Sequence, residues 1–257
     1  MKIAITGKGG VGKTTLAALL GRTLRDRGYS ALMVDADPDA NLAGALGVPR
    51  AEEIVPVAEM RELIFERTGA EPGSMGGFFK LNPTVNDLPA KLAISHDGVK
   101  LMVLGTVKSA GSGCICPESS LLKALLTHLF LNEKDALILD MEAGLEHLGR
   151  GTALGVDMMI VVVEPGKRSL ETASAIKRMA GELGIRKVGV VGSKVQGDAD
   201  IEFLRSELKD YNLLGHIPLS TAIRDADMRG SSLFELSPED MSFIEPIADR
   251  LEEELKG

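Results

Sequence analysis

The stretch that decides the fold is GKGGVGKTT, residues 7–15, which follows an apolar run over residues 2–6 and opens a segment of helical pattern. Glycines let a loop turn tightly and point successive backbone N–H groups into one concavity. The first turn of the helix adds the positive end of its dipole. A strand, this loop and a helix in that order predict the phosphate-binding loop of an α/β nucleotide-binding protein.

The side chains of this loop have separate expected tasks. We expect Lys13 to reach the β- and γ-phosphates of ATP and the Thr14 hydroxyl to ligate Mg²⁺. The loop backbone should cradle the phosphate oxygens. The positions expected to contact the nucleotide are Gly9, Gly10, Val11, Gly12, Lys13, Thr14 and Thr15.

Apolar, β-branched runs recur along the chain, with helical stretches between them. The predicted strands cover residues 2–6, 31–37, 100–105, 136–141, 158–164, 187–192 and 213–217. Several of these runs lack polar alternation, which is typical of strands covered by helices on both faces. The sequence predicts an α/β fold with a doubly wound, mainly parallel sheet, and phosphate sites at the carboxyl ends of its strands.

Residues 48–99 break this alternation. They contain an amphipathic helical segment over 57–67 and a Gly- and Pro-rich passage over 69–89. We interpret the chain as one P-loop ATPase domain over residues 1–257, in which the region around 48–99 is an inserted surface subregion. Long segments of this kind are often lids or interaction surfaces.

The overall charge is acidic. A formal net charge of −8 argues against electrostatic binding to nucleic acid or to an anionic membrane. The longest apolar runs, such as residues 158–163, fall far short of the roughly 20 residues that a spanning helix needs. No charged leader with an apolar stretch and a cleavage site is recognisable. We expect a cytoplasmic protein without nucleic-acid or membrane partners.

Carboxylates stand at the ends of two predicted strands. Asp37 closes the run over 31–37, and Asp140 follows the apolar residues 136–139, which is the Walker B arrangement. Carboxylates beside Mg-ATP hold metal-bound water or orient the attacking water. We expect Asp35 to support the Mg²⁺ shell and Asp39 to be a solvated loop charge.

The chain has two cysteines, Cys114 and Cys116, separated by one residue. This spacing disfavours a disulfide between them. Two thiolates can share one soft metal ion, but they do not complete a four-coordinate site. A two-fold dimer would bring four thiolates around one axis. The alternative is that both are small, half-buried structural side chains.

The loop resembles that of the deviant Walker A ATPases, which include MinD, ParA and nitrogenase iron protein. The resemblance rests on Lys8, which matches the lysine that reaches the partner's nucleotide in that family. It implies a face-to-face homodimer with ATP between the subunits, and it gives catalytic roles to Lys8, Lys13 and Asp37. Asp37 would assist hydrolysis at the first switch, near Asn41. Alternatively, Lys8 only complements phosphate charge.

The same resemblance extends to the later nucleotide contacts. Gly144 matches the second-switch glycine whose N–H meets the γ-phosphate, beside Asp140. Ser193-Lys194-Val195 stands where the family has Asn-Lys-Val, whose asparagine reads adenine. Lys194 and Pro218 are expected at the nucleotide, but the shorter Ser193 leaves open how adenine is read.

A narrower resemblance joins the cysteines to the nucleotide site. Residues 106–108, the glycine-rich lead into Cys-x-Cys-Pro-Glu, and residues 140–151 are similar to the CooC-type ATPases, which assist nickel insertion into carbon monoxide dehydrogenase. This implies a metallochaperone in which Cys114 and Cys116 of both subunits hold Ni²⁺ or Zn²⁺. ATP would close the dimer, and the partner would be carbon monoxide dehydrogenase or a related nickel enzyme. The roles of Glu142 and His147 stay open.

The main alternative is an ATP-dependent electron donor similar to nitrogenase iron protein. Four thiolates per dimer would also satisfy a [4Fe–4S] cluster. However, that protein supplies its cysteines from two separate segments, unlike the close pair here. A positioning protein of the MinD or ParA kind leaves the cysteine pair unexplained.

Overall fold

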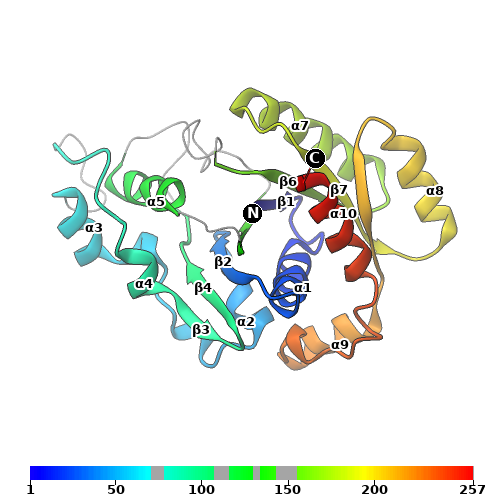
Figure 1. Cartoon of the computed structure of the whole chain (residues 1–257), viewed down its shortest axis with the longest axis horizontal. Coiled ribbons are helices and arrows are strands. Elements are labelled where there is room, and N and C mark those ends of the chain that lie inside the picture. Colours follow the sequence, from blue (N-terminus) through cyan, green and yellow to red (C-terminus); the bar gives the residue numbers. More distant parts are fainter. Residues whose placement is uncertain (71–77, 107–115, 130–133, 143–154, 257) are drawn as a thin grey trace.

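The computed structural model describes residues 1–70, 78–106, 116–129, 134–142 and 155–256 (Figure 1). Within these ranges the strands form one eight-stranded sheet in the order β3-β4-β2-β5-β1-β6-β7-β8. Every neighbouring pair is parallel except β3 and β4. The strands are β1 (Lys2–Gly7), β2 (Ser30–Ala36), β3 (Ile94–His96), β4 (Val99–Val103), β5 (Asp135–Met141), β6 (Met158–Val163), β7 (Val188–Val195) and β8 (Asn212–Pro218).

The predicted fold class is confirmed. All seven predicted strands are present, with ends that differ by at most three residues, and the sheet is mainly parallel. The edge strand β3 was not predicted. It has three residues and pairs antiparallel with β4.

Helices connect the strands and cover both faces of the sheet. They are α1 (Lys13–Asp26), α2 (Leu42–Leu46), α3 (Arg61–Thr68), α4 (Leu88–Leu92), α5 (Pro117–His128), α7 (Lys167–Leu183), α8 (Asp198–Glu207), α9 (Thr221–Arg229) and α10 (Ile244–Lys256). Three short 3₁₀ turns complete the described elements: η1 (Ala51–Glu53), η2 (Val57–Glu59) and η3 (Leu233–Glu235). None of the helices in the described ranges has both the length and the apolar character to cross a membrane.

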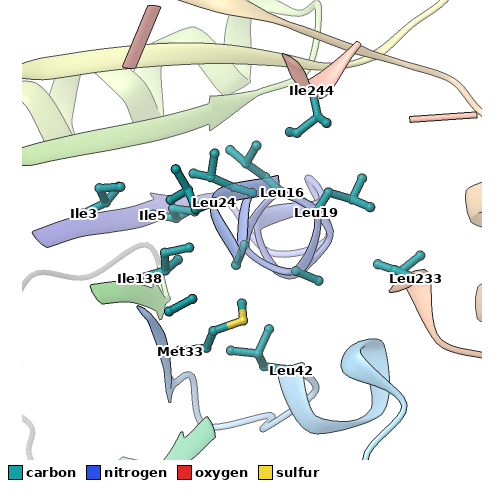
Figure 2. Packing of buried hydrophobic residues seen from close by; sticks show 14 of the residues in the cluster. Ile3, Ile5, Leu16, Leu19, Leu24, Met33, Leu42, Ile138, Leu233 and Ile244 are labelled. Carbon is teal, nitrogen blue, oxygen red and sulfur yellow. The ribbon is translucent and has the colours of Figure 1, made fainter. Parts of the chain in front are cut away.

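Alternate residues of the central strands belong to two hydrophobic cores. Ile3 and Ile5 pack with α1 and α10 on one face, whereas Ala4 packs with α5 and α7 on the other. Figure 2 shows α1 wedged between the sheet and the C-terminal part of the chain, with Leu16 and Leu19 buried there. Because both faces are covered, every residue of β1 and β6 is buried.

The subregion around residues 48–99 contains η1, η2, α3, α4 and β3. The single helix expected over 57–67 is wrong in one respect, because η2 ends at Glu59 and α3 begins only at Arg61. The Ala58 N–H donates to the Leu104 carbonyl at 3.0 Å, which ties η2 to the end of β4 rather than to the helix. The interpretation of this region as an insertion stays a prediction.

Candidate nucleotide site

The predicted phosphate-binding loop lies where the central strands end. It follows β1, which is hydrogen-bonded to β5 on one side and β6 on the other. Asp35 of β2 pairs with Asp140 of β5, so the residues after β2 and the end of β5 are neighbours. Parallel strands end at one edge of the sheet, and this edge therefore gathers the loop and both carboxylate segments.

Glycines are required at two ends of the loop. Gly7 approaches β6 so closely that a Cβ would stand 2.5 Å from the Val162 carbonyl oxygen. Gly12 has a φ of 95° and is the N-cap of α1, where no side chain of the described residues accepts from the first turn. The uncapped N–H groups of that turn form a site for an anion. The loop is therefore built to receive phosphate.

The structure brings together Lys13 and Asp37, two of the predicted catalytic residues. Lys13 is buried, and its Nζ lies 3.7 Å from Oδ2 of Asp37. Lys8 is exposed, as are Gly9 and Gly10. An exposed lysine at this position is free to reach beyond its own subunit, but the structure contains one chain, and its catalytic role stays a prediction.

Asp140 and Thr14 fit a magnesium site. The Thr14 hydroxyl donates to Oδ2 of Asp140 at 2.6 Å. The second carboxylate oxygen, Oδ1, is buried and has no hydrogen-bond partner among the described residues. Mg²⁺ prefers carboxylate, hydroxyl and phosphate oxygens, so an unpartnered oxygen beside Thr14 suits it. These two residues would hold the ion.

Asp35 and Asp140 are both buried carboxyls with unusual acidities. Burial raises the pKa of Asp35 to about 7, and the nearby Asp140 charge adds to the rise. Burial also raises the pKa of Asp140 to about 6, against the opposing effects of the Thr14 hydrogen bond and the Lys13 charge. A bound cation would favour the ionised form of Asp140 and offset the free-energy cost of burying its charge.

Asp35 also shapes the segment that carries Asp37. Its two oxygens accept the N–H groups of Leu42 at 2.9 Å and of Asp37 at 3.1 Å. These bonds fix the backbone between β2 and α2. Asp39 and Asn41 are exposed, and Asn41 is the N-cap of α2. Asp35 therefore holds the loop between β2 and α2 in place. The sequence predicted only a role for Asp35 near Mg²⁺.

The end of β7 contacts the phosphate-binding loop. Ser193 is buried, and a Cβ on Gly12 would stand 3.0 Å from its Oγ. Lys194 Nζ donates to the Gly10 carbonyl oxygen at 2.7 Å and lies 2.6 Å from Oε1 of Glu164. Pro218 ends β8 and pairs in register with Val195. Lys194 thus lies against the phosphate-binding loop, and its expected contact with the nucleotide stays a prediction.

Two contacts at this edge were missed by sequence reasoning. Glu164, which follows β6, pairs with Lys194. Thr6 donates from its hydroxyl to the Glu142 carbonyl oxygen at 2.8 Å, joining β1 to the residue that follows β5. Opposite charges at the ends of two parallel strands could have indicated the first pair, had the neighbouring positions of β6 and β7 been known.

Cys116 caps α5. Its sulfur accepts the N–H of Ser119 at 3.4 Å, and the residue is half-buried. A sulfur at a helix N-terminus is held in a field that favours the thiolate, the form that binds metals. Cys114, Gly144 and His147 lie outside the described residues. Among the residues that are described, no group of three or more His, Cys, Asp or Glu side chains could hold a metal.

Comparisons with known proteins find matches that cover most of the chain. The protein-family model for the CobQ/CobB/MinD/ParA nucleotide-binding domain matches residues 2–233. The chain is 47% identical over 240 residues to the carbon monoxide dehydrogenase accessory protein CooC of Rhodospirillum rubrum, covering 93% of this chain and 91% of that protein. It is 45% identical, over 91% of each chain, to an uncharacterised ATP-binding protein of Methanocaldococcus jannaschii.

Solved structures support the fold alone. MinD of Pyrococcus horikoshii, complexed with Mg-ADP, superposes with a TM-score of 0.69 at 19% identity, covering 97% of this chain and 95% of that one. A plasmid partition protein of Borrelia burgdorferi bound to AMPPNP gives a TM-score of 0.69 at 17% identity, covering 98% of both chains.

Proposed function

Because this chain belongs to the CobQ/CobB/MinD/ParA family of nucleotide-binding domains, as a P-loop ATPase similar to CooC, we propose that it delivers a metal ion to a nickel enzyme. The recipient would be carbon monoxide dehydrogenase or a related enzyme. The cargo would be Ni²⁺ or Zn²⁺, held between two subunits by Cys114 and Cys116 of each. ATP binding would close the dimer, and hydrolysis would open it.

The observation that carries this proposal is the position of the Cys116 sulfur. It stands at the N-terminus of α5 and accepts a backbone N–H there. The other end of α5 lies at the amino edge of the sheet, where Leu126 accepts from Lys2 Nζ at 3.5 Å. A helix of 12 residues spans roughly 18 Å, so its N-terminus lies toward the carboxyl edge, where the phosphate-binding loop is.

With both sites near this edge, one closure of the dimer would complete the nucleotide site and the metal site together. Each subunit offers two thiolates, which is half of a four-coordinate site. A two-fold axis near the carboxyl edge would combine two halves. Tetrahedral zinc and planar nickel both accept sulfur ligands, so one set of four thiolates suits either cargo.

Hydrolysis would use the residues already gathered at this edge. Lys13 would bind the phosphate oxygens, and Thr14 and Asp140 would hold Mg²⁺. When bound, Mg²⁺ neutralises charge on the β- and γ-phosphate oxygens. Asp37, fixed through its N–H by Asp35, would orient the attacking water. Lys8, exposed on the loop, would complete the site of the partner subunit.

The metal content of the purified protein tests this function. Protein prepared without oxygen and loaded with Ni²⁺ or Zn²⁺ should contain one metal ion per dimer. Cys116→Ser and Cys114→Ser should each lose it, because serine lacks the soft thiolate. Serine at 116 should keep the N-cap of α5 and hence the fold. Elemental analysis with sedimentation velocity gives the stoichiometry.

Nucleotide binding is the control in this experiment. Both serine variants should bind ATP as the wild type does, which shows that the fold survives. If the Cys114→Ser/Cys116→Ser double variant keeps a full complement of metal, the cysteines are not the ligands and the metallochaperone proposal is wrong. Iron and sulfide in place of nickel or zinc would instead favour the electron-donor alternative.

A further inference from the structure

Lys194 has a backbone conformation that lysine rarely adopts. Its φ of 55° lies in the left-handed region, which is strained for a residue with a Cβ. The register between β7 and β8 also shifts between Gly192 and Val195. Irregularities of this kind re-aim side chains and are over-represented beside active sites. The strained backbone at Lys194 therefore indicates that its side chain has a functional role.

The re-aimed side chain joins two parts of the nucleotide site. Its ammonium lies between the Glu164 carboxylate at 2.6 Å and the Gly10 carbonyl oxygen at 2.7 Å. Glu164 is in place because β6 and β7 are adjacent parallel strands, with Val163 paired to Gly192. At Gly10, φ is 76°, so the loop turns there in a way that glycine permits.

We infer that Glu164 is a positioning residue that, through Lys194, fixes the peptide following Gly10 in the phosphate-binding loop. A planar peptide whose carbonyl is held on one side presents its N–H on the other. The N–H of that peptide belongs to Val11 and makes only a long bond of 3.4 Å to the Lys8 carbonyl. A phosphate oxygen can replace so weak a partner.

Loss of the pair would act on ligand binding more than on folding. The side chains of Lys194 and Glu164 are 47% and 40% exposed, and ion pairs this exposed add little stability. Without the clamp, the glycine would let the peptide turn over and present its carbonyl oxygen to the phosphates, which repel it. The inference requires nucleotide binding by the loop and is independent of any metal cargo.

Inorganic triphosphate separates this role from recognition of the base. Affinities for Mg-ATP and for Mg-triphosphate would be measured by calorimetry on wild type, Glu164→Gln and Lys194→Met. Both variants should bind both ligands more weakly by the same factor, about 3- to 10-fold, as expected for the loss of one hydrogen bond in the loop. Melting temperatures without ligand should match the wild type.

Charge-matched controls lie on α7. Lys167→Met and Glu171→Gln change exposed side chains on this helix, which follows Glu164 in the sequence, and should leave both affinities unchanged. Loss of ATP binding alone would show that Lys194 reads the base, and would overturn the inference. So would wild-type triphosphate affinity in Glu164→Gln. If Lys13→Ala still binds triphosphate, the loop is not the phosphate site, and the nucleotide-site assignment fails with the inference.

Discussion

A Lys13→Ala variant is expected to lose productive ATP binding and nearly all hydrolysis. Lys13 begins α1 with its side chain 8% exposed, so its ammonium acts where little water competes. In the complex with ATP, the Lys13 ammonium and the phosphates would form a buried charge pair. Removing the ammonium leaves the negative charge of the triphosphate without its partner. This should weaken ATP binding by ~10²–10³-fold, which calorimetry can measure.

The control for this change is a lysine away from the site. Lys209 is exposed beyond the end of α8, and Lys209→Ala should bind and hydrolyse ATP like the wild type. A circular dichroism melt shows whether Lys13→Ala is folded. Wild-type hydrolysis by folded Lys13→Ala protein would contradict the assignment of the loop.

An Asp140→Asn variant is expected to lose Mg²⁺-dependent hydrolysis while becoming more stable without Mg²⁺. The Asp140 carboxylate is nearly fully buried, and one oxygen has no hydrogen-bond partner in the described part of the chain. The neutral amide cannot replace the charged carboxylate as a ligand of Mg²⁺. The lost charge stabilisation amounts to several kcal/mol, so turnover should fall ~10²–10⁴-fold. Without Mg²⁺, the neutral amide removes a buried charge and its repulsion with Asp35.

The pH dependence of stability follows from the two raised pKa values. The pKa values of Asp35, about 7, and Asp140, about 6, lie above those of the same groups in the unfolded chain. Between about pH 4 and 7 the folded state therefore binds more protons than the unfolded state, and these groups make stability fall as pH rises. The loss is complete above pH 7.

Magnesium should reverse this loss, because it binds the ionised carboxylate. The increase in melting temperature on adding Mg²⁺ should be larger at pH 8 than at pH 5, and it should disappear in Asp140→Asn. Asp39→Asn, at an exposed carboxylate of the neighbouring loop, should keep the wild-type response. An equal Mg²⁺ effect on Asp140→Asn and wild type would place the ion elsewhere.

The central sheet could be predicted because its strands are continuous apolar runs. β1 and β6 are buried on both faces, so their sequences lack polar alternation, and β1 has a charge only at its first residue, Lys2. β3 was missed because Ile94–His96 is short, partly exposed and only one-third apolar. Similarly, the segment over 57–67 has a helical pattern, but a contact with β4 divides it at Met60. Local pattern predicts an element well only where tertiary contacts do not compete.

The candidate site divides in the same way. The loop and Asp140 could be found because motif, strand and helix are contiguous in the sequence. Glu164 could not, because its partner Lys194 is 30 positions away and meets it only through the order of β6 and β7. The backbone bonds of Asp35 were also hidden, since a carboxylate beside a nucleotide loop is first interpreted as a magnesium ligand. These hydrogen bonds can be identified only once the fold is known.

The most direct test of the proposed coupling is the metal affinity of the protein with and without a non-hydrolysable ATP analogue. If dimer closure completes both sites, the analogue should tighten Ni²⁺ or Zn²⁺ binding roughly 5- to 150-fold, and the metal should tighten analogue binding by the same factor. Lys8→Ala should lose this coupling, because its loop lacks the side chain proposed to reach the partner. An unchanged metal affinity in wild-type protein saturated with the analogue would contradict the account.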